Sequence, residues 1–192
     1  MLDRDLHTIR DLIYYQYSKL FCKGLLQTPN NLASSFDYSQ CVKKIFIELK
    51  SGVKNLPELI CQDLPFDENR KVCIFCGNAF DVSPDHIVPR SLKISVRCPS
   101  CDIIHAVHNL IWVCKVCNSS KGAFGLYEFY KHKYPDYKNY FDLIPPLAEM
   151  RYLRTMYHCH ECAGSLDSSD PNHDGKVDVL DIDFILHLTN NN

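Results

Sequence analysis

Hydrophobic spacing predicts helices in the N-terminal part of the chain. Apolar residues recur at steps of three and four over residues 2–23, as on one face of an amphipathic helix: Leu2, Leu6, Ile9, Ile13, Tyr17 and Leu20. A second helix is predicted over residues 39–50, with Gly52 just past its end and with an apolar face made of Val42, Ile45, Phe46 and Leu49. We expect these helices either to dock on a nucleic acid or to pack as a cap on the small core that follows.

The pattern changes at residue 71 and again near residue 125. Residues 71–122 contain cysteine pairs and the short β-branched runs "HIV" and "LIWV" instead of helix-length patterns. Helical spacing returns over 125–134, is broken by the prolines at 145 and 146, and resumes over 147–157. We therefore predict an α+β fold with four regions: helices at 1–65, a small core at 66–135, further helices at 136–164 and an acidic tail at 165–192.

The composition is that of an ordinary globular chain. The 192 residues are 46% hydrophobic and 23% charged, with a net charge of -2. Lys and Arg outnumber the acids from His86 to Lys133, and acids dominate from Glu161 onward, so the basic middle could hold phosphate. The sequence contains no run of about 18 apolar residues, so it predicts no membrane span. The charged N-terminus lacks the apolar stretch of a signal peptide, which favours a cytoplasmic protein.

The 11 cysteines have an unusual arrangement. Disulfides are not expected in the reducing cytoplasm, and eight of the cysteines form four C-x-x-C pairs. Two such pairs make one tetrahedral zinc site, so four pairs predict two structural zinc ions. The other three, Cys22, Cys41 and Cys61, are expected to be unpaired, buried apolar side chains.

The middle of the chain combines five elements in a fixed order. They are a C-x-x-C pair, Asp-His-Ile-Val-Pro at 85–89, Asn-Leu at 109–110, a C-x-x-C-Asn stretch that ends at residue 118, and Lys-Gly at 121–122. This stretch resembles the HNH nuclease family, in the subgroup whose ββα-metal fold is held by a four-cysteine zinc ribbon. The resemblance implies a zinc ion bound by Cys73, Cys76, Cys114 and Cys117.

The same residues suit phosphodiester hydrolysis, which needs an activated water and a cation on the scissile phosphate. A neutral imidazole can take a proton from water near pH 7, so His86 is the candidate general base. Successive side chains of a strand face opposite sides, so Asp85 diverges from His86 and can hold a metal. By the resemblance, Asp85 and Asn118 bind catalytic Mg²⁺ or Mn²⁺, and Asn109 orients the histidine through hydrogen bonds to nearby backbone.

Two basic side chains near this motif are candidate phosphate contacts. They are Arg90, just after the Asp-His-Ile-Val-Pro stretch, and Lys121, one turn into the helix expected after Cys117. A solvated surface charge is the alternative for each.

The 22 residues between His86 and Asn109 exceed what compact members of the family use. The excess carries one C-x-x-C pair, and we predict that it joins the last pair in a second zinc site formed by Cys98, Cys101, Cys159 and Cys162. Pairing of Cys98 and Cys101 with the first C-x-x-C pair and unliganded thiols are the alternatives. Four histidines are competing ligands: His105, His108, His158 and His160.

The tail contains "DPNHDGKVDVLD" at 170–181, which fits a twelve-residue calcium loop. Gly175 stands at the sixth position, where such a loop turns sharply, and "IDFILHL" follows as the expected exiting helix. The predicted calcium ligands are Asp170, Asn172, Asp174, Lys176 through its carbonyl, Asp178 and Asp181. The loop resembles EF-hand and dockerin repeats, and a flexible acidic tail is the alternative.

These features predict a metal-dependent endonuclease that hydrolyses DNA, with structural zinc, catalytic magnesium or manganese, and calcium in the tail. A non-catalytic zinc module that binds nucleic acid or protein is one alternative. An RNA nuclease of the same fold is the other. A homodimer would suit cleavage of both strands, although no coiled coil indicates one.

Overall fold

The structure is a computed structural model and describes residues 6–26, 37–56, 71–90 and 109–187. Its elements, in chain order, are α1 (Ile9–Leu26), α2 (Tyr38–Lys50), β1 (Val82–His86), β2 (Leu110–Cys114), α4 (Lys115–Lys121), α5 (Leu126–Lys133), the 3-10 turn η4 (Tyr140–Leu143), α6 (Pro146–Ala163), α7 (Val179–Asp183) and the 3-10 turn η5 (Phe184–Leu186). This mixture of helices with a small two-stranded sheet confirms the α+β class. None of the described helices is both long and apolar enough to cross a membrane.

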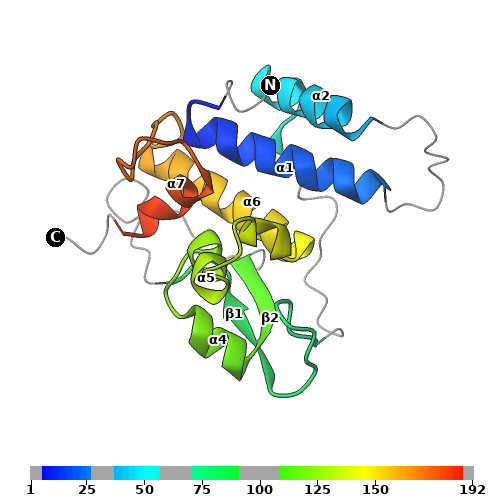
Figure 1. Cartoon of the computed structure of the whole chain (residues 1–192), viewed down its shortest axis with the longest axis vertical. Coiled ribbons are helices and arrows are strands. Elements are labelled where there is room, and N and C mark those ends of the chain that lie inside the picture. The colour runs from blue at the N-terminus through cyan, green and yellow to red at the C-terminus, as the bar shows by residue number, and fades with distance from the viewer. Residues whose placement is uncertain (1–5, 27–36, 57–70, 91–108, 188–192) are drawn as a thin grey trace.

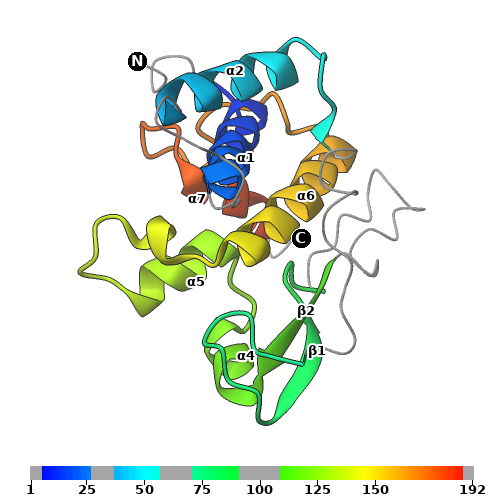
Figure 2. The same ribbon diagram turned by 90° about the vertical axis from the view of Figure 1, so that its right-hand side faces the viewer.

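The N-terminal helices and the sheet occupy opposite ends of the molecule (Figures 1 and 2). Helices α1 and α2 lie side by side at one end, the β hairpin formed by β1 and β2 lies with α4 at the other, and α5 and α6 lie between. Helix α1 packs against α2, α6 and α7, so the N-terminal helices cover the C-terminal ones. Buried side chains form one continuous cluster that runs from α1 through the hairpin to η5.

Helix α1 begins later than the spacing of its apolar residues predicts. The backbone N–H of Asp11 donates to the Thr8 hydroxyl at 3.2 Å, and the Asp11 carboxylate accepts from the backbone N–H of His7 at 3.1 Å. This capping arrangement satisfies N–H groups that the first turn of a helix leaves without partners. The predicted start at residue 2 is therefore too early, and residues 2–5 lie outside the described part of the chain.

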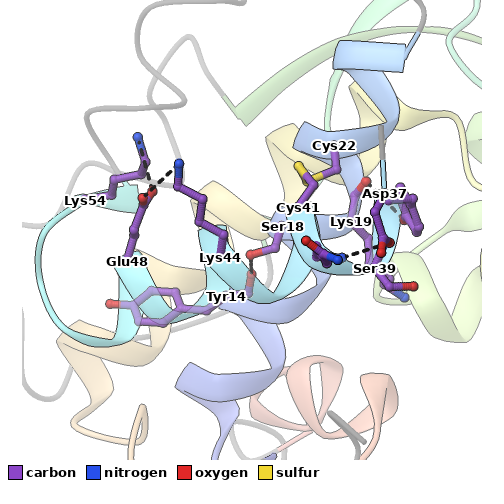
Figure 3. Close-up of a disulfide and its surroundings, with 12 residues drawn as sticks. Tyr14, Ser18, Lys19, Cys22, Asp37, Ser39, Cys41, Lys44, Glu48 and Lys54 are labelled. Carbon is purple, nitrogen blue, oxygen red and sulfur yellow. Dashed lines mark hydrogen bonds and ion pairs between the residues drawn. A yellow bond between two sulfur atoms is a disulfide. The ribbon is translucent and has the colours of Figure 1, made fainter. Parts of the chain in front are cut away.

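Helix α2 confirms the prediction for 39–50, and Asp37 caps it by accepting hydrogen bonds from the first turn. It also corrects a prediction about the cysteines. Cys22 of α1 and Cys41 of α2 are joined by a disulfide with an S–S distance of 2.06 Å (Figure 3). The expectation that they are unpaired is wrong, because the packing of α1 on α2 brings together two cysteines that no C-x-x-C spacing connects. Cys61, predicted to be unpaired in the same way, lies outside the described residues.

The β hairpin is antiparallel, with Val82 opposite Cys114 at one end and His86 opposite Leu110 at the other. Ile111 and Val113 are buried, and α4 follows β2 without a break and packs against both strands. The described elements thus follow the order strand, strand, helix. The segment that links the two strands, residues 91–108, lies outside the described part of the chain.

The proline pair begins α6 instead of only breaking the preceding pattern. Pro145 is the N-cap residue and Pro146 the first residue of the helix, where the missing N–H of proline costs no hydrogen bond. The helix continues past the predicted end at residue 157 to Ala163. Gly164 ends it with a left-handed φ of 68° that favours glycine.

Candidate functional site

The first and third C-x-x-C pairs meet at one end of the hairpin, where Val82 lies opposite Cys114. Cys73 and Cys76 lie in a tight turn that precedes β1, in which the Cys73 carbonyl accepts from the Gly77 N–H at 2.8 Å. The other pair flanks the start of α4 (Figure 1). The ligand atoms of Cys73, Cys76, Cys114 and Cys117 all lie within 4.8 Å of one another. We call this group the cysteine cluster.

The cysteine cluster has the dimensions of a zinc site. Four sulfurs at about 2.3 Å from a tetrahedral zinc ion lie about 3.8 Å apart, and the Sγ atoms of Cys76 and Cys114 are 3.7 Å apart. The backbone N–H of Cys117 lowers the pKa of Cys114 to about 7, whereas burial raises the pKa of Cys117, so Cys114 is the thiol that most readily forms the thiolate that a metal requires. The cluster could therefore hold a zinc ion. Among the described residues, no other group of three or more His, Cys, Asp and Glu side chains comes together in this way.

The predicted second zinc site lies only partly within the described residues. Cys98 and Cys101 fall outside them, while Cys159 is buried near the end of α6 and Cys162 is half-buried. His160, a competing ligand, uses both ring nitrogens: Nδ1 lies 2.8 Å from the Ser165 hydroxyl and Nε2 lies 3.0 Å from the carbonyl oxygen of Ile182. Burial lowers its pKa to about 4, as expected for a neutral core histidine. The second zinc site stays a prediction.

Three of the four candidate catalytic residues, Asp85, His86 and Asn118, line one open cavity of about 190 Å³. We call it the Asp85 cavity. Asp85 and His86 are the last two residues of β1, and Asn118 lies on α4, which packs against that strand. Arg90 also lines this cavity, and the remaining walls come from Pro89, Gly122 and Ala123. The end of β1, the residues just after it and α4 thus bring together a carboxylate, an imidazole, a carboxamide and a guanidinium group.

Asn109 does not line the Asp85 cavity but anchors the chain beside it. The residue is fully buried, its side-chain oxygen accepts from the Val88 N–H at 2.9 Å, and its side-chain nitrogen donates to the Val88 carbonyl at 3.1 Å. Its own carbonyl accepts from the Ile87 N–H at 2.9 Å. These three bonds fix the two residues that follow His86, and the orienting role of Asn109 toward His86 stays a prediction.

Lys121, predicted as a phosphate contact, is buried in the core and does not line the Asp85 cavity. Its side chain is 1% exposed, and Nζ approaches the carbonyl oxygen of His86 at 3.5 Å. Burial lowers the pKa of this lysine to about 8, and the charges of Asp85 and Asp183 oppose that shift. Its place is inside the core behind the strand, so the structure assigns it a contact with the protein backbone and not the predicted surface position.

The predicted calcium loop winds around its own acidic side chains. Asp170 accepts from the backbone N–H groups of Asp174 and Gly175 at 3.1 and 3.0 Å, and Asp181 accepts from those of Asn172 and Asp178 at 3.4 and 2.9 Å. Asp178 caps α7, so the exiting helix begins inside the loop, at Val179. These carboxylate oxygens bind backbone N–H groups of the loop itself, and calcium binding stays a prediction.

Sequence reasoning missed two buried carboxyl groups that join α5, α6 and α7. Asp183 accepts from the Tyr152 hydroxyl at 2.6 Å and from the Glu128 N–H at 2.8 Å, and burial raises its pKa to about 8. Glu149 accepts from the Tyr127 hydroxyl at 2.9 Å, and burial raises its pKa to about 7. Neither belongs to a motif, so only the packing of the helices shows that they are buried.

Comparison of the chain with protein-family models, with curated proteins and with solved structures finds no match in any of the three. The functional interpretation therefore depends on the residues of this chain and on their geometry.

Proposed function

We propose that this protein is a metal-dependent endonuclease that hydrolyses DNA. The observation that carries the proposal is the meeting of Asp85, His86, Asn118 and Arg90 around one open cavity. These four groups are a metal-binding carboxylate, a base that works near neutral pH, a second oxygen ligand and a phosphate contact. They come from the motif positions at which the sequence predicts them.

In this proposal His86 accepts the proton of the attacking water as the general base. Asp85 and Asn118 supply oxygen atoms, the donor type that Mg²⁺ and Mn²⁺ prefer. A bound divalent ion would neutralise charge on the scissile phosphate and the leaving oxygen. Arg90, which is exposed at the rim of the cavity, would hold a neighbouring phosphate.

The supporting residues keep this site in shape. Asn109 fixes the backbone after His86 by bonding both backbone groups of Val88. Zinc in the cysteine cluster would tie β1 and β2 to the start of α4 at the other end of the hairpin. A hairpin of two five-residue strands is too small to be stable on its own, so a metal there would contribute to folding.

The test is incubation of the purified protein with supercoiled plasmid, with Mg²⁺ or Mn²⁺ and with a chelator. We expect nicked or linear DNA with metal and intact DNA with chelator. His86→Ala should lower the cleavage rate by roughly a hundredfold or more, as for loss of a general base, and should keep the zinc content. His132→Ala, which removes an exposed histidine on α5 away from the Asp85 cavity, is the control and should cleave normally.

Two results would overturn the proposal. One is cleavage by folded His86→Ala at the wild-type rate. The other is binding of DNA without cleavage under any divalent metal, which would favour a non-catalytic module. Cleavage of RNA but not of DNA under the same conditions would transfer the mechanism to an RNA nuclease.

A further inference from the structure

The last residue pair of the hairpin, His86 and Leu110, has outward-facing carbonyl groups. The Ile87 N–H donates to the Asn109 carbonyl at 2.9 Å, just beyond this pair. Hydrogen-bonded and non-hydrogen-bonded residue pairs alternate along an antiparallel ladder. Because Ile87 and Asn109 form a hydrogen-bonded pair, the adjacent residues His86 and Leu110 form no backbone hydrogen bond with each other. The carbonyl groups of His86 and Leu110 therefore point away from the partner strand, one toward each outer edge of the hairpin.

Both outward carbonyls accept a hydrogen bond from a buried cation. Nη1 of Arg151 lies 2.7 Å from the carbonyl oxygen of Leu110, and Nζ of Lys121 lies 3.5 Å from that of His86. Arg151 is 5% exposed and Lys121 is 1% exposed. A short bond from a desolvated guanidinium to a carbonyl is charge-assisted and stronger than an ordinary backbone bond. The Arg151 contact is the shorter of the two by a wide margin.

Arg151 comes from a part of the chain that the nuclease-like motif does not include. It lies on α6, which passes beside this end of the hairpin in both views of the molecule (Figures 1 and 2). Its bond to Leu110 connects the helical layer to the strand opposite His86. Leu110 also follows Asn109 directly, so the same contact fixes the residue that anchors Val88.

We propose that Arg151 is a positioning residue for the candidate nuclease site, an inference that rests on the proposed function. By holding the Leu110 carbonyl, Arg151 fixes the end of β2. Leu110 is paired with His86, and its neighbour Asn109 bonds Val88, so a fixed Leu110 also fixes the backbone on both sides of His86. Loss of this bond should let the His86 end of the hairpin shift. A misplacement of about 1 Å can slow an enzymatic reaction roughly a hundredfold.

The test compares Arg151→Met and Arg151→Lys with the control Tyr127→Phe. The control removes a buried hydrogen bond between α5 and α6 that does not touch the hairpin. We expect Arg151→Met to lower the single-turnover cleavage rate by about tenfold or more. Its affinity for a labelled DNA duplex, measured without divalent metal, and its zinc content should stay unchanged. Arg151→Lys should fall between Arg151→Met and wild type, because its ammonium can also donate to the carbonyl. Tyr127→Phe should cleave at the wild-type rate.

A readout independent of cleavage separates this inference from the proposed function. Imidazole NMR signals of His86 should shift or broaden in the Arg151 variants and stay unchanged in Tyr127→Phe. If wild type cleaves no nucleic acid, the proposed function fails, and these signals alone decide whether Arg151 positions His86. If Arg151→Met does not fold, Arg151→Lys carries the test. A folded Arg151 variant with unchanged His86 signals, or one that cleaves at the wild-type rate, would overturn the inference.

Discussion

Gly125 occupies a position with no room for a side chain, and Gly125→Ala should strongly destabilise the protein. A Cβ atom on this residue would lie 2.3 Å from both Cγ and Oδ2 of Asp183. Asp183 is fully buried there and accepts hydrogen bonds from the Tyr152 hydroxyl and the Glu128 N–H. The alanine methyl group must therefore push the carboxyl group out of its place between α5 and α6.

The size of the effect follows from three contributions. Overpacking a filled core costs about 1–3 kcal/mol. A buried donor that loses its partner costs about 1–3 kcal/mol. Displacement of the Asp183 carboxyl can break its hydrogen bonds with both donors, the Tyr152 hydroxyl and the Glu128 N–H. Alanine lowers the conformational entropy of the unfolded chain relative to glycine, which offsets about 0.4–1 kcal/mol of the loss in stability. This gain applies because any residue can adopt the φ of -62° at Gly125. With the loss of one to two donor bonds, we expect a net loss of about 2–8 kcal/mol, a large part of the stability of an ordinary domain.

Urea unfolding followed by circular dichroism and by the fluorescence of Trp112, the single tryptophan, measures this change. Gly24→Ala is the matched control, because Gly24 lies in α1 and a Cβ there would meet no atom within 4 Å. The control should gain about 0.5–1 kcal/mol. Equal stability of Gly125→Ala and wild type would refute the packing of Asp183 described above. In a Gly125→Ala background, Asp183→Ala should cost less than it does alone, because the two changes disturb the same contact.

Four further predictions concern charge, the disulfide and metals. The folded state keeps a proton on Glu149, whose pKa of about 7 exceeds the usual 4.5. The contribution of Glu149 to stability should therefore be complete below about pH 4.5 and fall by about 3 kcal/mol toward pH 7, and Glu149→Gln should remove this part of the slope in urea titrations at several pH values while leaving the part that comes from Asp183. Reduction of the Cys22–Cys41 bond, which closes a separation of 19 residues, should lower the unfolding free energy by about 3 kcal/mol, and a Cys22→Ala, Cys41→Ala variant should no longer respond to reductant. Zinc chelation should unfold the hairpin, seen as loss of hydrogen-exchange protection in β1 and β2, while helix signals persist. Calorimetry should detect calcium binding with a dissociation constant of roughly 10⁻⁵ to 10⁻³ M, and Asp174→Ala should bind calcium much more weakly. If the wild type releases no heat, the tail is a loop that binds no calcium.

Local patterns predict the parts of this fold that local forces determine. Helix α2 begins within one residue of its predicted start because the apolar spacing and the Asp37 cap act within a few turns. Within the cysteine cluster, each C-x-x-C spacing brings its own two cysteines close together, one pair in the turn before β1 and the other at the start of α4. The residues of the Asp85 cavity come together for a related reason, since they stand at the end of one strand and on the helix that packs against it.

Contacts between distant segments are not visible in such patterns. The Cys22–Cys41 bond depends on how α1 packs against α2, and no spacing rule connects these residues. The sequence predicts a phosphate contact or a solvated surface charge for Lys121, yet this residue ends α4 and the fold buries it behind β1. Arg151 is one of several basic residues in its stretch, and only the docking of α6 directs it to Leu110.

The two ends of the hairpin are held by different means, and this separation bears on the mechanism. The cysteine cluster adjoins the pair Val82–Cys114, whereas Asp85 and His86 lie at the other end, four residues and roughly 13 Å away along the strand. A metal ion in the cluster could not touch the proposed catalytic groups, so any contribution that it makes to the proposed activity would pass through the folding of the hairpin. At the opposite end, Asn109, Lys121 and Arg151 bond the backbone beside His86 without any metal. A variant that loses zinc should therefore lose cleavage and hairpin structure together, whereas an Arg151 variant should lose cleavage while the hairpin keeps its zinc.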